Sequence, residues 1–326
     1  MEQRVLLIYP RSNKHLGLWN DLFSDNRVYL RCTDRRDTSK FMRLIGSALI
    51  KVHNSIIHLP FHHVLFNYFD LYKLVRSIDH LVLIDGALNV VSLSELKRCK
   101  KMNPSLRISL YLINSLRASS PILKKVRPQI GMFNWDNIFT FDPTDARDYG
   151  YIYLGFNYYS SHTVDTKCSA DNDVYFVGGL KGERQDLIND TYTFLTSKGV
   201  KCHFDIMLMK TSDVIQLKGA NYYHGWNSYD EVLAGVNQSK CIIEITQKGQ
   251  RGATLRYFEA ICMNKKLLSN NDSITSFPFY NPKWMKVFHS PNDIDTDWIK
   301  REEKVDYGYK GEFSPVHLID YLLSLS

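Results

Sequence analysis

The feature that most constrains the fold is an alternation of short apolar runs with amphipathic stretches. In the first half of the chain the runs are nearly unbroken and rich in β-branched residues, and they cover 5–9, 55–59, 81–84, 108–113 and 138–141. Runs of this kind predict a parallel sheet with helices on both faces. Between the first two runs, residues 39–53 carry apolar side chains at helical spacing with basic residues beside them. This segment predicts a packed helix or, alternatively, a basic helix that touches a membrane.

The second half begins the same alternation again. Strands are predicted at 174–177, 201–209, 241–245 and 266–269, with helices at 186–198, 228–236 and 254–263. Near the end of the chain, Ser314-Pro315 has the pattern of an N-cap followed by a first-turn proline, which predicts a helix to Leu323. Two consecutive βα-repeating halves imply two Rossmann-like α/β domains with a cleft between them.

The polar segment between the halves predicts the domain boundary. At about 100 to 200 residues per domain, 326 residues are enough for two domains. We expect an N-terminal domain at 1–160, a linker at 161–173, a C-terminal domain at 174–310 and a C-terminal helix within 311–326 that crosses back to the first domain.

Charge and cysteine usage narrow the possible partners and compartment. Residues 1–160 carry 22 Lys and Arg against 13 Asp and Glu, so this half should favour an anionic partner. The six cysteines are widely spaced without a C-x-x-C pair, which indicates reduced thiols and a cytoplasmic protein. The N-terminus does not have the pattern of a secretory signal, and no stretch approaches the ~20 apolar residues of a membrane span.

The stretch from Cys241 to Asn271 carries the clearest functional pattern. A buried strand is followed by a glycine-containing loop, a helix that begins near Thr254, and a further strand. Free amides and the positive end of a helix dipole suit a diphosphate, so we expect phosphate oxygens against Gly252, Ala253 and Thr254.

Glu259 lies further along this helix among apolar neighbours. A carboxylate on the side that faces the loop can accept hydrogen bonds from vicinal hydroxyls, as acidic residues do when they hold a ribose. The competing interpretation is an exposed helix glutamate, or a partner for Arg256 or Lys265.

This segment resembles the donor-binding region of GT-B glycosyltransferases, particularly bacterial capsule and lipopolysaccharide enzymes. The similarity lies in the loop, in TLRYFEA and in KKLLSNN, about 30 residues, and it extends more loosely over 174–290. It implies that residues 252–254 hold the donor diphosphate and that Glu259 binds the nucleotide ribose. It also implies an enzyme that works without a metal or another cofactor.

The resemblance assigns further residues and shows one departure. It implies that Gly179 lies in the phosphate loop, that Lys181 and Arg184 contact the departing diphosphate, and that His224 lies near the nucleotide base. Many retaining family members carry a second glutamate eight residues before the first, and Arg251 takes that place here. The stereochemical outcome is therefore left open, and Arg251 is a candidate partner for a phosphate or an acidic sugar.

A catalytic base for an inverting reaction should come from the first domain. Ligands of open α/β sheets gather at the carboxyl ends of the strands, where Asp85 follows an apolar run and precedes Gly86. The alternative for Asp85 is a structural role. Asp142 occupies a similar place, although Asp142-Pro143 also predicts a turn or helix start, and His62 and His63 are equally compatible with surface or packed positions.

Several motifs argue against other functions. Asp171-Asn172-Asp173 precedes a strand instead of following one, and Trp298 replaces the glycine that a calcium loop over Asp293, Asp295 and Asp297 would need, so no metal site is predicted. No Walker-type phosphate loop, G-x-G-x-x-G or G-x-S-x-G motif occurs. The basic clusters lack interleaved aromatic residues, so nucleic acid is not the expected partner.

The sequence therefore predicts a hexosyltransferase of bacterial surface polysaccharide synthesis. It would move a sugar from a nucleoside diphosphate sugar to a saccharide or lipid-linked saccharide, held by the basic first domain at the inner face of the cytoplasmic membrane. Two alternatives stay open: a nucleotide-sugar epimerase or hydrolase on the same scaffold, and a nonenzymatic basic protein that binds nucleic acid.

Overall fold

The computed structural model describes residues 3–10, 16–33, 71–117, 121–160, 170–180, 184–208, 217–224, 228–247 and 249–325, with the backbone alone at 121–125. Several sequence predictions lie outside these residues. They are the strand at 55–59, the helix at 39–53, both adjacent histidines at 62 and 63, and Lys181.

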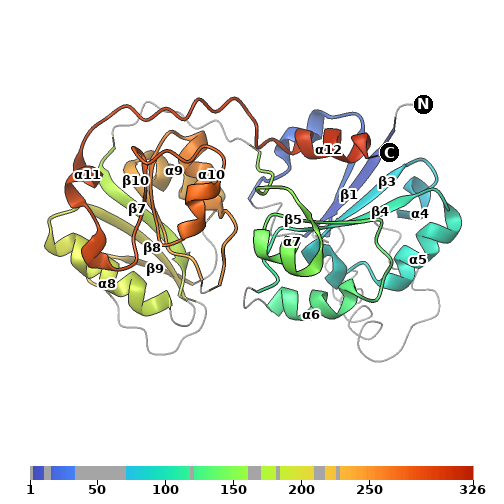
Figure 1. Cartoon of the computed structure of the whole chain (residues 1–326), viewed down its shortest axis with the longest axis horizontal. Helices are drawn as coiled ribbons and strands as arrows, with labels where there is room; N and C mark the ends of the chain where they lie inside the picture. The colour runs from blue at the N-terminus through green and yellow to red at the C-terminus, as the bar shows by residue number, and fades with distance from the viewer. Residues whose placement is uncertain are drawn as a thin grey trace. The chain divides into compact units, whose positions relative to one another are not determined.

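The chain divides into two compact units, coloured from blue to red along the sequence in Figure 1. Unit 1 comprises Met1–Phe141, Asp145–Leu154 and Ser314–Ser326, and unit 2 comprises Asp142–Thr144 and Gly155–Phe313. The C-terminal helix α12, Pro315–Ser324, thus belongs to unit 1, as predicted.

Unit 1 is built on a six-stranded parallel sheet in the order β2-β1-β3-β4-β5-β6. Its strands are β1 (Val5–Tyr9), β2 (Val28–Cys32), β3 (His80–Ile84), β4 (Arg107–Leu112), β5 (Asn137–Thr140) and β6 (Ile152–Tyr153). Its helical segments are η1 (Asn20–Ser24), α4 (Leu71–Leu74), η3 (Asp85–Asn89), α5 (Leu93–Met102), α6 (Pro121–Ile130), α7 (Pro143–Tyr149) and α12. The predicted strands at 5–9, 81–84, 108–113 and 138–141 are confirmed to within a residue.

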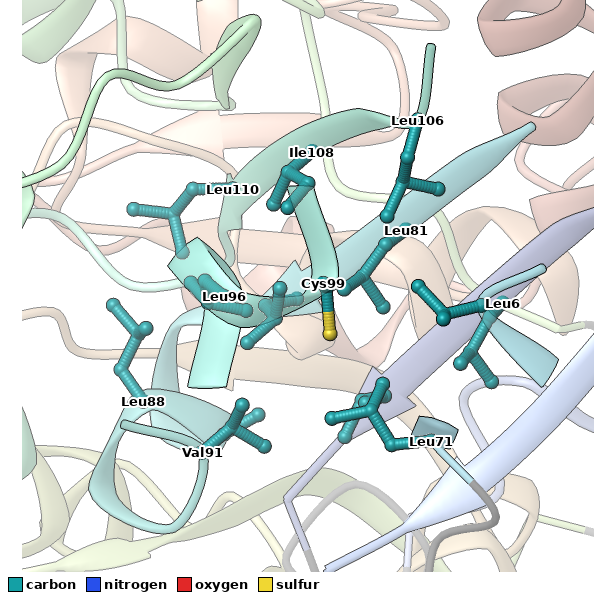
Figure 2. Close-up of a cluster of buried hydrophobic side chains, with 14 of the residues drawn as sticks. Leu6, Leu71, Leu81, Leu88, Val91, Leu96, Cys99, Leu106, Ile108 and Leu110 are labelled. Carbon is teal, nitrogen blue, oxygen red and sulfur yellow. The ribbon is translucent and has the colours of Figure 1, made fainter. Parts of the chain in front are cut away.

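The apolar runs form strands here because both of their faces are covered. Every residue of β1 and β3 is buried, which matches the unbroken hydrophobicity expected of a central parallel strand. On one face, alternate strand residues such as Leu6 and Leu81 pack against Leu96 and Cys99 of α5 (Figure 2). Ser92 caps α5 by accepting a hydrogen bond from the Glu95 amide.

Helix α12 is anchored to η1 and to the loop that precedes β2 in unit 1. The Ser314 hydroxyl donates a hydrogen bond of 2.6 Å to Asp21, and Arg27 donates one of 2.8 Å to Asp320. The apolar face of the helix, which includes Leu318 and Leu322, is fully buried. Cap, proline and apolar stripe together explain why the sequence alone located this helix.

Unit 2 repeats the architecture with a parallel sheet in the order β12-β11-β10-β7-β8-β9. Its strands are β7 (Asn172–Gly179), β8 (Cys202–Leu208), β9 (Asn221–His224), β10 (Ser239–Glu244), β11 (Lys266–Ser269) and β12 (Met285–Val287). Its helical segments are α8 (Arg184–Ser197), α9 (Tyr229–Asn237), α10 (Leu255–Cys262), η4 (Asp272–Ser276), η5 (Pro291–Asp293) and α11 (Thr296–Lys300). The structure therefore has the predicted two Rossmann-like α/β sheets.

Parallel strands place the loops that follow β7, β10 and β11 at one edge of the unit 2 sheet. This edge is where open α/β sheets bind ligands, at the carboxyl ends of the strands. The loops after these three strands lead into α8, α10 and η4, respectively. The segment singled out in the sequence is thus positioned beside the glycine turn that ends β7.

Candidate functional site

The first residue of α8, Arg184, lies against Gly178 near the end of β7. β7 ends at Gly178 and Gly179, and α8 begins at Arg184. A Cβ atom on Gly178 would overlap Nη2 of Arg184, so the glycine allows the guanidinium to lie directly on the backbone. The guanidinium carbon also lies 5.9 Å from the centre of the Phe176 ring.

Arg184 is a half-buried cation whose Nε is buried without a hydrogen-bonding partner among the described residues. Burial lowers the pKa of its guanidinium to about 10, and the nearby carboxylate of Glu244 only partly opposes this effect. Burying a charge without a partner is unfavourable. An anion that accepts hydrogen bonds from Arg184 would remove this penalty.

The start of α10 supplies further donors at the same edge. Thr254 is the N-cap residue, and its Oγ1 accepts a hydrogen bond of 3.2 Å from the Arg256 amide. Within the described part of the chain, the amides of Gly252, Ala253 and Thr254 donate to no protein group. Free amides at a helix N-terminus, together with the helix dipole, favour an anionic ligand.

Glu244, which the sequence reasoning missed, organises this helix start from the end of β10. It is 2% exposed, and its two carboxylate oxygens accept hydrogen bonds from the hydroxyls of Thr254 and Ser269. Ser269 Oγ in turn accepts a hydrogen bond of 3.0 Å from the Asn271 amide. Burial raises the pKa of Glu244, against the effect of these hydrogen bonds. In the sequence, the available sign of a special role for Glu244 was that it is an acidic residue within the otherwise apolar run CIIEI.

The two asparagines of the KKLLSNN segment hold the adjoining loops. Asn270 Oδ1 accepts hydrogen bonds from both the amide and the hydroxyl of Thr246, at 2.7 and 3.0 Å. Asn271 Nδ2 donates to the carbonyl of Arg251 at 3.2 Å. These contacts fix the loop that leads to α10 against the end of β11.

A cavity of about 430 Å³ opens between these loops. Its size lies within the range of small-molecule sites, and its walls are rich in amide, hydroxyl and charged groups. The lining residues are Arg184, Leu187, Thr246, Gln247, Gly249, Gln250, Arg251, Asn270, Asn271, Asp272 and Ser273. Arg184 and Arg251, both singled out from the sequence, are therefore brought to the same cavity although they are far apart in the chain.

Glu259 lies in the interior of unit 2. Its side chain is 0% exposed. The Oε1 atom accepts a hydrogen bond of 2.8 Å from the Tyr229 hydroxyl and forms an ion pair of 2.7 Å with Arg256. The Oε2 atom has no partner among the described residues. Burial raises its pKa to about 7 in spite of the arginine. The structure thus shows the Arg256 pairing that was the competing interpretation. The ribose contact stays a prediction, and it requires this carboxylate to become accessible.

The remaining donor-site candidates occupy separate places. Gly179 ends β7 beside Arg184, whereas His224 ends β9, two strands from β7, where it is exposed and does not line the cavity. Lys181 belongs to the undescribed residues. Of the donor-site candidates, the cavity lining includes Arg251 and Arg184 but not Gly179, His224 or residues 252–254, of which Gly252 and Ala253 are buried.

Asp85 follows β3 in unit 1, at the carboxyl end of the strand as predicted. It is 1% exposed, and it accepts hydrogen bonds from the backbone and side-chain nitrogens of Asn114 at 3.1 and 2.9 Å and from the Gly86 amide. Burial raises its pKa to about 6. These contacts tie the end of β3 to the loop after β4, and the role of Asp85 as a base stays a prediction.

The aspartates at the positions of the two metal motifs accept hydrogen bonds from backbone amides. Asp173 accepts from the Lys201 amide at 2.9 Å, and Asp295 caps α11 by accepting from the Trp298 amide at 2.9 Å. Over the described ranges, no group of three or more His, Cys, Asp or Glu side chains is placed to hold a metal ion. Within the same ranges, no helix is long and apolar enough to cross a membrane.

Comparisons with known proteins show similarity in fold only. No family model and no curated protein matches the chain. Among solved structures, UDP-N-acetylglucosamine 2-epimerase from Rickettsia bellii has a TM-score of 0.55 and 11% identity, over 99% of this chain and 97% of that one. The glycosyltransferase SnogD from Streptomyces nogalater has a TM-score of 0.47 and 10% identity over 100% of both chains. A T4 phage BGT mutant in complex with UDP-glucose has a TM-score of 0.46 and 11% identity, over 90% of this chain and 88% of that one. The chain thus has a two-domain Rossmann-like fold of the GT-B type.

Proposed function

We propose that this chain is a glycosyltransferase whose unit 2 binds a nucleoside diphosphate sugar. The observation that carries the proposal is the half-buried guanidinium of Arg184, which lines a polar cavity together with Arg251, the residue before the free amides of 252–254. A diphosphate matches both groups, because it presents several anionic oxygens to a cation and to a helix N-terminus at once.

The proposed chemistry follows from the charge that develops when the glycosidic bond breaks. Negative charge then grows on the departing nucleoside diphosphate, and preorganised donors lower the barrier by stabilising it. We assign this role to Arg184 and to the amides of residues 252–254, and we propose that Lys181, three residues before Arg184 in the sequence, shares it. Arg251 lines the same cavity and is proposed to contact the second phosphate or the sugar.

Unit 1 is proposed to hold the acceptor, a saccharide or lipid-linked saccharide, at the inner face of the cytoplasmic membrane. Its excess of basic residues would favour a lipid-linked pyrophosphate or an anionic headgroup surface. Asp85 is the proposed base for an inverting reaction, because burial has already moved its pKa towards neutrality. Synthesis of a bacterial surface polysaccharide is the pathway that these assignments fit.

A nucleotide-sugar epimerase is the second candidate. The observation in its favour is the overall similarity in fold to UDP-N-acetylglucosamine 2-epimerase, along nearly the whole of both chains. Both candidates need a nucleoside diphosphate site in unit 2, so the two differ only in what happens to the sugar.

The donor site can be tested by thermal unfolding with UDP, GDP, CDP and TDP and their sugars. We expect one nucleotide to raise the midpoint, and we expect Arg184→Met to lose this shift. Lys218→Met is the matched control, because it removes an exposed cation of the same unit that does not line the cavity. If no nucleotide stabilises the wild-type protein, the proposed donor site is wrong.

Product analysis then separates the candidate reactions. Release of free nucleoside diphosphate only when a saccharide acceptor is present supports transfer, whereas conversion of the nucleotide sugar without an acceptor supports the epimerase or a hydrolase. Salt-sensitive binding of oligonucleotides, with no response to any nucleotide sugar, would instead support a nucleic-acid-binding protein.

A further inference from the structure

A second cavity, of about 390 Å³, lies at the other end of the unit 2 sheet. It opens where β10 begins at Ser239 and β11 begins at Lys266, at the amino ends of the strands. Open α/β sheets normally bind their principal ligand at the carboxyl ends. This cavity is therefore distinct from the donor site and carries no role in the proposed transfer.

Two of the lysines that line the cavity are engaged by the protein. Lys266 is 2% exposed, and its Nζ donates to the carbonyls of Trp298 and Arg301 at 2.7 and 2.6 Å and pairs with Glu303 at 3.2 Å. Lys240 pairs with Asp173 at 3.2 Å and with Glu302 at 3.4 Å. These contacts build the wall of the cavity and neutralise both lysines.

Two other cations of the lining form no ion pair with a described carboxylate. Lys265 Nζ donates to the carbonyl of Asn237 at 2.7 Å, but no described carboxylate lies within ion-pair distance of it. Burial is the cause that lowers the pKa of this half-buried amine. The exposed side chain of Arg301 forms no ion pair with a described residue, and its charge acts at longer range on the carboxylates of Glu303 and Asp295.

The strand register brings lysines of the lining close together. Cys241 of β10 pairs with Lys266 of β11, so Lys240 and Lys265 precede paired positions on neighbouring strands. Lys240 is compensated by its ion pairs with Asp173 and Glu302. The amine of Lys265, which is half-buried and lacks an ion pair, is therefore the charge at this end of the sheet that favours an anion.

We propose that this cavity is a second anion site, which binds a phosphomonoester with its phosphate on Lys265 and Arg301. A phosphate dianion matches two cations that form no ion pair with a described carboxylate, and arginine presents a planar fork of donors that suits phosphate oxygens. The cavity is large enough for a small phosphorylated molecule and not only for the phosphate group. Carboxylates do not oppose binding strongly, because Glu303 is already paired with Lys266 and Glu302 is largely exposed.

Calorimetric titration of the full chain with glucose 1-phosphate tests the proposal, with inorganic phosphate as a parallel titration. We expect saturable binding that weakens at least about tenfold in Lys265→Met and in Arg301→Gln, since each removes a charged hydrogen-bond donor. Lys218→Gln is the control, since this exposed lysine precedes β9 at the far edge of the sheet. Tighter binding of glucose 1-phosphate than of inorganic phosphate identifies an organic ester as the ligand, and equal binding identifies the free ion.

Two further titrations separate this site from the donor site. Saturating UDP and the Arg184→Met substitution should both leave the binding of glucose 1-phosphate unchanged. Arg301→Gln keeps the proposal testable even if Lys265→Met unfolds, because Arg301 is exposed. The proposal is overturned if the wild-type protein binds neither phosphate compound, if UDP competes with them, or if folded Arg301→Gln binds as well as the wild type.

Discussion

Replacing Arg184 with methionine should change two properties of the protein in opposite directions. The guanidinium is desolvated and its Nε has no partner among the described residues, so its charge destabilises the free protein. The same charge is the proposed contact of the donor diphosphate. Arg184→Met should therefore stabilise the free protein and weaken the binding of nucleotide.

The gain in stability follows from the shift in pKa. Burial lowers the pKa of Arg184 to about 10, well below the ordinary value of a guanidinium, and at about 1.36 kcal/mol per unit this corresponds to roughly 3 kcal/mol of destabilisation at neutral pH. Methionine also loses the cation–π contact with Phe176, worth about 1 kcal/mol. The net increase in the free energy of unfolding should be about 2 kcal/mol.

The loss in affinity follows from the charged contact. A hydrogen bond between charged groups contributes about 1.5 to 3 kcal/mol, so the dissociation constant for the preferred nucleoside diphosphate should rise about 10-fold to 150-fold. A residue with a purely structural role would not combine this loss with a more stable free protein.

Differential scanning calorimetry with and without nucleotide measures both effects. For a domain of this size, about 2 kcal/mol should raise the midpoint of unit 2 by roughly 4 to 8 °C, while the shift produced by nucleotide should shrink. Lys218→Met should change neither quantity. An unchanged or lower midpoint, with the nucleotide shift intact, would refute the reasoning about Arg184.

Three further substitutions test the surrounding contacts. Burial raises the pKa of Glu259 from 4.5 to about 7, so between these pH values the folded state keeps a proton that the unfolded state has released. The free energy of unfolding should therefore fall as the pH rises through this range. Glu259→Gln should remove this pH dependence, which would appear as a smaller difference between the urea midpoints at pH 5 and pH 8. Glu244→Ala leaves the hydroxyls of Thr254 at the α10 start and of Ser269 at the end of β11 without their acceptor, and it should lower the free energy of unfolding by about 2 kcal/mol in urea titrations. Gly178→Ala should displace the Arg184 guanidinium and weaken nucleotide binding about tenfold in calorimetry, because the displaced contact is a charged hydrogen bond; unchanged affinity would show that the guanidinium does not bind there.

The sequence was sufficient wherever the deciding information lies within a few neighbouring residues. The strand at 5–9 was located to the residue, because its unbroken apolar run suits a strand covered on both faces. The pattern of cap and proline at Ser314-Pro315 marked the start of α12, because the cap oxygen and the amide that it accepts from are local partners. The strands β2 and β9, which contain no fully buried residue, were missed.

The sequence also located the glycines, the loop and the helix start of the candidate site. It did not predict which charged side chains there are buried and which are paired. Glu259 had two interpretations of equal local merit, and only the packing of α10 paired it with Arg256 inside unit 2. Glu244 read as part of an apolar strand until its two hydroxyl donors were seen.

What the sequence by itself determined is the two-fold succession of strands and helices, since propensity, periodicity and capping act between near neighbours. Only the tertiary structure decided which charges are desolvated and which are paired. Arg184 meets Arg251 at one cavity, and Lys265 meets Arg301 at another, because the parallel register places loops from distant parts of the chain at the two ends of one sheet. Burial and electrostatic compensation depend on those distances in space, and no local pattern of residues encodes them.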